Sequence, residues 1–215
     1  MTATNRLPTN RLPTNRRPTN LRGEFTNLPN LVTMGRVALV PFVLYFIDNF
    51  SPLRSFIASL LYLGAAAGDA LDGYLARSRD QVSMLGKFLD PLADKLIVTA
   101  VLVFMVDLGR VPAWVVVVLL ARDFAINGLR SVASAQGLVI AASDGGKIKT
   151  ALQLVAIMML LIYFRYPALG TSIAVDYRKV GLIVLYLSMA ASLFSGAQYL
   201  RDFFSAVLRQ PRTAA

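Results

Sequence analysis

The chain has 215 residues, of which 56% are hydrophobic and 16% are charged, and its formal net charge at pH 7 is +10. A soluble domain of this length would carry more charge, so the composition indicates an integral membrane protein with one helical domain. The absence of Cys and His excludes disulfides, thiolate nucleophiles, histidine-based triads and the usual zinc ligands. The basic balance favours contact with anionic lipid or phosphate-bearing substrates, and no nucleic-acid-binding signature is present.

Residues 1–24 differ from the rest of the chain. The pentapeptide TNRLP at 4–8 recurs at 9–13 and, as TNRRP, at 14–18. Proline at every fifth position prevents a continuous helix, and the segment has too few apolar residues for a core. We expect a disordered basic tail that lies on anionic lipid. An organellar transit peptide is the alternative, although the prolines argue against the amphipathic helix that it would need.

Six apolar stretches follow, each near the roughly 20 residues that span a bilayer. They cover residues 28–47, 53–76, 88–108, 111–132, 147–165 and 179–203. Short polar or proline-containing joints separate them. The sequence therefore predicts an all-α membrane protein with six transmembrane helices, a catalytic domain over residues 25–205 and a short C-terminal tail over 206–215.

The distribution of lysine and arginine predicts the orientation of these helices. With the N-terminus inside, fourteen basic residues face the cytoplasm and five face the opposite side. The remaining three fall within spans: Arg36, Lys95 and Arg122. Both termini are therefore expected on the cytoplasmic side of an inner (plasma) membrane, in a multi-pass protein.

Four aspartates stand inside this apolar sequence, two on each of two consecutive predicted helices. Asp69 and Asp72 are one turn apart, and Asp90 and Asp94 are spaced i, i+4. A charged carboxylate within a span costs roughly 2.5–3.5 kcal/mol on insertion scales, so four together need positive neighbours. Four negative charges match two divalent cations, and hard cations such as Mg²⁺ prefer carboxylate ligands. The alternative for Asp90 is a helix N-cap before Pro91.

The aspartates and the residues between them form a motif at fixed spacing: Asp69, Asp72, Gly73, Ala76, Arg77, Gly86, Asp90 and Asp94. This motif resembles the signature of the CDP-alcohol phosphatidyltransferase family. The resemblance implies a six-helix membrane fold, usually a homodimer, with a two-metal site for Mg²⁺ or Mn²⁺. It also implies transfer of a phosphatidyl group from CDP-diacylglycerol to an alcohol, with release of CMP.

The resemblance assigns roles to the motif residues. All four aspartates are expected as metal ligands, and Asp90 and Asp94 are the catalytic pair, with Asp94 as a ligand or the base for the acceptor hydroxyl. The expected contacts to the CDP group come from Asn30, Thr33, Asp69, Gly73, Ala76, Arg77 and Gly86. For Asn30 and Thr33, simple N-capping and interface polarity remain an equal alternative.

Within the family, residues 27–153 are most similar to the phosphatidylglycerophosphate synthases, which implies glycerol 3-phosphate as the acceptor. At 121–123 the chain reads Ala-Arg-Asp where these synthases often show Ala-Arg-Glu. A phosphate-bearing acceptor needs cations near the metals, and the candidates are Arg122, Arg130, Lys147 and Lys149. The alternative for the two lysines is ordinary cytoplasmic loop charge. Asp123 is expected to point to a different helix face from Arg122.

Other functions stay open at this point. Within the family, the acceptor could be inositol phosphate, serine, or phosphatidylglycerol as in a cardiolipin synthase. From a different class, acids within membrane spans also mark cation transporters. A transporter would place its acids near the middle of the membrane and show repeated halves. Here the acids gather at one end of two spans, and the halves do not repeat.

Overall fold

The computed structural model describes residues 28–79, 84–136, 144–167 and 174–209. Six helices lie in these ranges, namely α2 (Leu28–Phe46), α3 (Pro52–Arg79), α4 (Met84–Asp107), α5 (Ala113–Ala135), α6 (Asp144–Ile162) and α7 (Tyr177–Arg209). Each corresponds to one of the expected apolar stretches, which confirms the helical class. The expected basic tail, residues 1–24, lies outside the described residues.

Several helices extend beyond their apolar stretches. α3 continues to Arg79, α4 begins at Met84, and α7 continues to Arg209, into the segment expected as a tail. Asp90 and Pro91 therefore lie inside α4 and not at its start. The N-cap alternative for Asp90 is wrong because the helix begins more than one turn earlier.

A small antiparallel ribbon within the last predicted joint is the one feature that the all-α expectation missed in the described residues. β1 (Arg165–Pro167) pairs with β2 (Ala174–Asp176), with Tyr166 opposite Val175. Tyr163, between α6 and β1, has a positive φ of 62°, a conformation that lets the chain turn sharply. The ribbon brings the end of α6 back to the start of α7.

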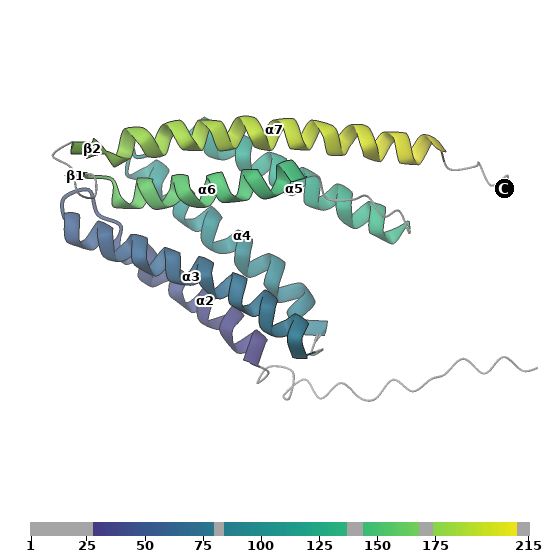
Figure 1. Ribbon diagram of the computed structural model, residues 1–215, viewed down its shortest axis with the longest axis horizontal. Helices are drawn as coiled ribbons and strands as arrows, with labels where there is room; N and C mark the ends of the chain where they lie inside the picture. Colours follow the sequence, from purple (N-terminus) through teal and green to yellow (C-terminus); the bar gives the residue numbers. More distant parts are fainter. Residues whose placement is uncertain (1–27, 80–83, 137–143, 168–173, 210–215) are drawn as a thin grey trace, which may run out of the picture.

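Successive helices run in opposite directions (Figure 1). The end of α3, the start of α4 and the end of α7 consequently lie at one end of the bundle, here called the motif end. The β1–β2 ribbon and the α4–α5 connection lie at the other, here called the ribbon end. α2 packs against α3 and α4, whereas α7 packs against α5 and α6, and α3 joins the two groups through α6.

The core consists of large aliphatic side chains and small residues at helix contacts. Leu102, Met105 and Leu160 are fully buried. At Gly181 of α7, an added Cβ would lie 2.9 Å from the Leu160 side chain of α6. Only glycine therefore allows these two helices their close approach, the kind of small-residue packing that membrane helices use.

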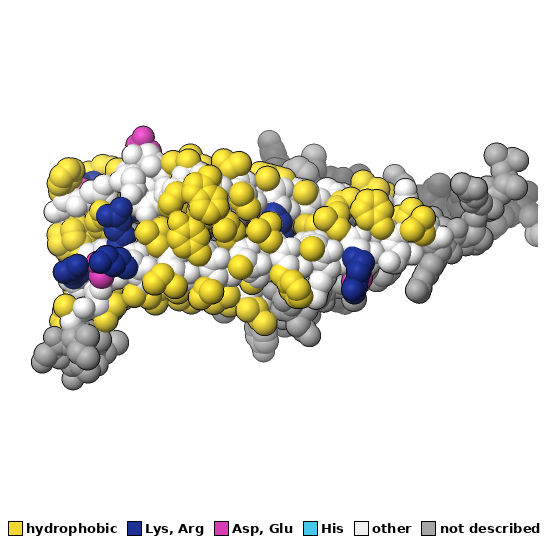
Figure 2. Space-filling view, turned by 90° about the horizontal axis from the view of Figure 1, so that it is seen from above, with side chains coloured by type: hydrophobic (Ala, Val, Ile, Leu, Met, Phe, Trp, Pro, Cys, Tyr) yellow, Lys and Arg dark blue, Asp and Glu magenta, His cyan; other side chains and the backbone are white. Residues whose placement is uncertain are grey.

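Large apolar side chains also cover much of the outer surface (Figure 2). Phe50 is 93% exposed, and Val117, Phe124 and Phe194 are each more than 60% exposed. In the described part of the chain, one helical segment, Tyr177–Leu208, is both long and apolar enough to cross a membrane. The six spans expected from the sequence stay a prediction.

A buried arginine connects the elements at the ribbon end. Arg110, between α4 and α5, is 1% exposed. Its five N–H donors meet five oxygen atoms at 2.6–3.0 Å, which are Asn49 Oδ1, Ser55 Oγ and the carbonyls of Asp48, Leu160 and Leu161. The Tyr163 ring covers the guanidinium at 4.2 Å. We call these residues the Arg110 cluster.

The Arg110 cluster keeps its charge although it is buried. Desolvation lowers the pKa of Arg110 to about 10, which still leaves the guanidinium protonated at neutral pH. Every donor of the side chain has an acceptor, so the cost of burying the cation is offset by hydrogen bonds. The cluster ties the α2–α3 connection, the α4–α5 connection and the end of α6 together.

Candidate functional site

The aspartate motif lies toward the end of α3 and the start of α4, at the motif end (Figure 1). Asp69 and Asp72 belong to α3, and Asp90 and Asp94 belong to α4. Within each helix the spacing of three or four residues puts the pair on one face. The structure thus confirms the helical placement that the motif requires.

Several predicted site residues lie outside the part of the chain whose side chains are described. They are Asn30, Asp69, Asp72, Gly73, Ala76, Arg77, Gly86, Asp90, Asp94 and Lys147. Among the described side chains, no group of three or more acidic residues could hold a metal ion. Convergence of the four carboxylates therefore stays a prediction. Its support is the helical register and the all-oxygen donor set, which suits Mg²⁺ or Mn²⁺.

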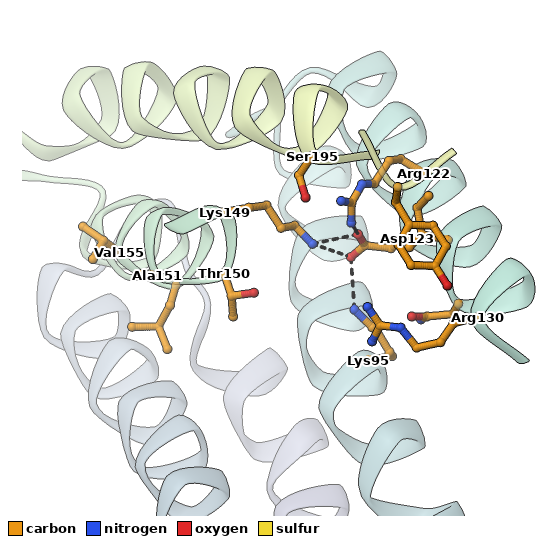
Figure 3. Close-up of a pocket in the computed structure, with 13 residues that line it drawn as sticks. Lys95, Arg122, Asp123, Arg130, Lys149, Thr150, Ala151, Val155 and Ser195 are labelled. Atoms are coloured by element: carbon orange, nitrogen blue, oxygen red, sulfur yellow. Dashed lines mark hydrogen bonds and ion pairs between the residues drawn. The ribbon is translucent and has the colours of Figure 1, made fainter. Parts of the chain in front are cut away.

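A cluster of charged side chains lies beside the motif, where α4, α5 and α6 come together (Figure 3). Asp123 of α5 is 7% exposed and binds three cations. Lys149 Nζ lies 2.7 Å from both of its carboxylate oxygens. Lys95 Nζ lies 3.1 Å from Oδ2, and a terminal nitrogen of Arg122 lies 3.0 Å from Oδ1. We call these four residues the Asp123 cluster.

α7 forms hydrogen bonds with two members of the Asp123 cluster. Arg122 Nε donates a hydrogen bond of 2.8 Å to the carbonyl of Ser192. A Cβ at Gly196 would lie 3.1 Å from Arg122 Nε, so the absent side chain makes room for the guanidinium. Ser188 Oγ donates to the Lys149 carbonyl at 3.2 Å. α7 thereby orients the Arg122 guanidinium and binds the backbone of α6 at Lys149.

The Asp123 cluster borders two cavities. The larger, about 720 Å³, opens between α4, α5, α6 and α7, and its lining includes the whole cluster together with Arg130, Thr150, Ser195 and Tyr199. The smaller, about 120 Å³, lies toward α2 and α3, and its lining includes Arg36, Tyr62, Lys95, Asp123, Lys149 and Gln153. Lys95, Asp123 and Lys149 line both, so they stand at the partition between the two cavities.

The structure brings three of the four predicted acceptor residues to the larger cavity. Arg122 and Lys149 belong to the Asp123 cluster, and Arg130 lies at the rim with its guanidinium 5.8 Å from the Tyr199 ring centroid. Lys147 is among the residues without a described side chain. Thr33 is a predicted nucleotide contact whose side chain is described, and it is fully buried in α2.

One expectation about this site is wrong. Asp123 does not face away from Arg122, because the long arginine side chain curves back to the neighbouring carboxylate. Sequence reasoning also gave no role to Asp123, Lys95 or Arg36. A signal was present, since ionisable residues within apolar spans need partners. Outside the motif's helices the predicted spans contain two acids, Asp123 and Asp202, and Asp123 is the one that lies near the middle of its span.

Comparison with known proteins found a matching family and several relatives. A sequence model described as CDP-alcohol phosphatidyltransferase matches residues 26–194. A Bacillus subtilis (strain 168) protein named CDP-diacylglycerol–glycerol-3-phosphate 3-phosphatidyltransferase is 40% identical over 149 residues, covering 64% of this chain and 77% of its own length.

Two further relatives carry the same name. The protein of Haemophilus influenzae (strain ATCC 51907 / DSM 11121 / KW20 / Rd) is 35% identical over 81% of this chain and 92% of its own length. The protein of Rickettsia bellii (strain RML369-C) is 32% identical over 81% and 94%. The match spans the motif helices and the helices that carry the Asp123 cluster. The chain belongs to the CDP-alcohol phosphatidyltransferase family.

Proposed function

We propose that this protein transfers the phosphatidyl group of CDP-diacylglycerol to sn-glycerol 3-phosphate, giving phosphatidylglycerophosphate and CMP. Family membership supports the phosphatidyl transfer, and the shared name of the relatives supports this acceptor. The observation that carries the proposal is a cavity beside the motif helices whose charged lining residues are four cations and one carboxylate.

The charge of the cavity favours an acceptor with its own phosphate. Its charged lining consists of one acid, Asp123, and four cations, which are Lys95, Arg122, Arg130 and Lys149. The lining therefore has a surplus of three positive charges. A phosphate monoester carries close to two negative charges at neutral pH. Serine has no phosphate, and the phosphate of phosphatidylglycerol is a singly charged diester. The surplus therefore favours glycerol 3-phosphate or inositol phosphate, and the names of the relatives favour the former.

Two divalent cations, Mg²⁺ or Mn²⁺, would be held by Asp69, Asp72, Asp90 and Asp94. When bound, such ions neutralise the diphosphate of a CDP-lipid and stabilise the charge of the leaving group. The donor set fits, because carboxylate oxygens suit these metals and the helical spacing pairs the acids on α3 and on α4. Asn30, Thr33, Gly73, Ala76, Arg77 and Gly86 are the proposed nucleotide contacts, together with Asp69.

The protein's own residues would bind the acceptor and accept its hydroxyl proton. Arg122, Arg130, Lys147 and Lys149 bind the phosphate of glycerol 3-phosphate, which directs its 1-hydroxyl toward the motif helices. Asp94 accepts the hydroxyl proton, with Asp90 one turn away as the second catalytic carboxylate. The acceptor oxygen bonds to the phosphorus that carries diacylglycerol. The bond from that phosphorus to the bridging oxygen breaks, and CMP leaves with the bridging oxygen.

A membrane location follows from this substrate and from the surface of the molecule. CDP-diacylglycerol resides in a bilayer, and the exposed apolar side chains of the outer surface would face its acyl chains. We propose a multi-pass protein of the inner membrane, with six spans, both termini cytoplasmic and the motif end at the cytoplasmic surface. By family analogy it would act as a homodimer.

One assay tests the proposed function. Purified full-length protein is given radiolabelled CDP-diacylglycerol, Mg²⁺ or Mn²⁺, and one acceptor at a time: glycerol 3-phosphate, inositol phosphate, serine or phosphatidylglycerol. Among the four acceptors, we expect only glycerol 3-phosphate to give CMP release and a labelled lipid. We expect no turnover in the presence of EDTA. We also expect no turnover by Asp94→Asn, although that variant stays folded. Turnover with another acceptor at a higher kcat/KM would replace the acceptor assignment, and normal activity of Asp94→Asn would remove the proposed base.

A further inference from the structure

Asp123 occupies an unusual place among the residues of the larger cavity. It is an acid in a site proposed to bind an anion, and it stands at the partition between the two cavities. Both of its carboxylate oxygens are bound, by three cations from three different helices, α4, α5 and α6. An acid so placed would repel a phosphate if it acted alone, so its presence calls for an explanation.

The geometry supplies one. The cations Lys95, Arg122 and Lys149 converge on a single point, and that point is the Asp123 carboxylate. Without an anion there, three like charges would repel one another at close range. Figure 3 shows Lys95 and Lys149 reaching the Asp123 carboxylate from two different directions. The carboxylate thus reduces the repulsion among the three cations before the acceptor binds, as a bound phosphate would do afterwards.

We propose that Asp123 is a positioning residue for the acceptor. Its carboxylate keeps the three cations converged on the cavity before the acceptor arrives, and it yields part of their hydrogen bonds to the acceptor phosphate. Three cations and one carboxylate leave a local charge of +2, which matches a doubly charged phosphate monoester. This inference rests on the proposed function, and it adds a residue that holds the binding groups without touching the reacting atoms.

The test compares Asp123→Asn with Asp123→Glu in the full-length enzyme. Asparagine keeps the shape and removes the charge, so the cations separate and the KM for glycerol 3-phosphate rises about tenfold, as for the loss of one charge-assisted contact. The KM for CDP-diacylglycerol changes less than about twofold, because that substrate does not depend on these cations. Asp123→Glu restores the KM for glycerol 3-phosphate to within about threefold of the wild type. Asp202→Asn, an exposed acid of α7, is the matched control and leaves both constants unchanged.

A second measurement separates positioning from a general structural role. Thermal unfolding is followed with and without sn-glycerol 3-phosphate, and we expect a smaller ligand-induced rise in Asp123→Asn than in the wild type or Asp202→Asn. An Asp123→Asn enzyme with unchanged or lower KM for glycerol 3-phosphate overturns the proposal. Failure of both Asp123→Asn and Asp123→Glu to fold would also overturn the proposal.

Failure of the proposed function would look different. The wild type would then give no product from glycerol 3-phosphate in the presence of CDP-diacylglycerol. The thermal measurement would still decide the role of Asp123, because it needs anion binding and no turnover. Equal stabilisation of wild type and Asp123→Asn by glycerol 3-phosphate would overturn the positioning role.

Discussion

The ribbon end and the region beside the motif helices each hold a cluster of charged and polar side chains, but the clusters differ in how their charges are balanced. In the Arg110 cluster one cation meets five oxygen atoms, and each of its donors has a partner. In the Asp123 cluster three cations share one carboxylate beside a cavity of about 720 Å³. In the first cluster every donor of the cation has a partner within the protein, whereas the second cluster carries a net positive charge.

This difference separates a structural role from a binding role. A buried cation whose donors are all satisfied stabilises the fold and has no capacity for a ligand. A group of cations with surplus charge at a cavity wall is costly for the empty protein and becomes favourable when an anion binds. Changes in the Arg110 cluster should therefore reduce stability, and changes around the Asp123 cluster should reduce acceptor binding.

The largest expected effect is on stability, from Arg110→Met. This change removes the arginine donors of five oxygen atoms, three of them in buried hydrogen bonds, and breaking such a network costs about 3–5 kcal/mol. Denaturant unfolding in detergent micelles measures the loss. Arg165→Met, an exposed arginine at the same end, is the control. Equal stability of the two variants, or a raised KM for glycerol 3-phosphate in folded Arg110→Met, would break the comparison.

Lys149→Met should show the opposite pattern. The lysine binds both carboxylate oxygens of Asp123 and lines both cavities. Loss of a charged hydrogen-bonding group should raise the KM for glycerol 3-phosphate about 10- to 100-fold. Steady-state kinetics with each substrate varied in turn measure it, and Lys179→Met, an exposed lysine at the ribbon end, is the control. A change confined to the KM for CDP-diacylglycerol would remove Lys149 from the acceptor site.

Gly196→Ala should have a smaller effect on the same constant. The new Cβ would lie 3.1 Å from Arg122 Nε and press on the side chain that the Ser192 carbonyl orients. The guanidinium can move by a few tenths of an ångström, so we expect the KM for glycerol 3-phosphate to rise about threefold. Gly128→Ala on α5, where a Cβ meets nothing within 4 Å, is the control. An equal response of both variants would argue against a tight fit around Arg122.

The smallest expected effect is a pH-dependent one at the ribbon end. Asp176 precedes α7 and accepts a hydrogen bond from the Lys179 amide, which, together with nearby Arg165, lowers the pKa of the carboxyl. Its stabilisation is present above the ordinary carboxyl pKa of about 3.9 and is lost as the pH falls through the lowered value. Thermal midpoints of wild type and Asp176→Asn should differ slightly at pH 7 and converge as the pH falls through the lowered pKa of the carboxyl. A constant difference across this range would exclude the charge as the cause.

Much of the fold was predictable because its signals are local in sequence. Apolar stretches of about 20 residues separated by polar joints indicate helices, and six appear where they were expected. The spacing within the aspartate motif likewise needed only helical periodicity, and α3 and α4 confirm it. Helix ends were less predictable, because polar residues continue the backbone hydrogen bonding of α3, α4 and α7 beyond their apolar parts.

The sequence by itself therefore determined the helical class, the family and the residues proposed for metal and nucleotide, all of which depend on spacing along the chain. Only the tertiary structure decided which cations meet Asp123 and that Arg110 is structural. Lys95, Arg122 and Lys149 come from three helices, and the acceptors of Arg110 come from the α2–α3 connection, the start of α3 and the end of α6. Such contacts depend on how the helices pack and on the flexible length of lysine and arginine side chains, which spacing along one helix does not encode.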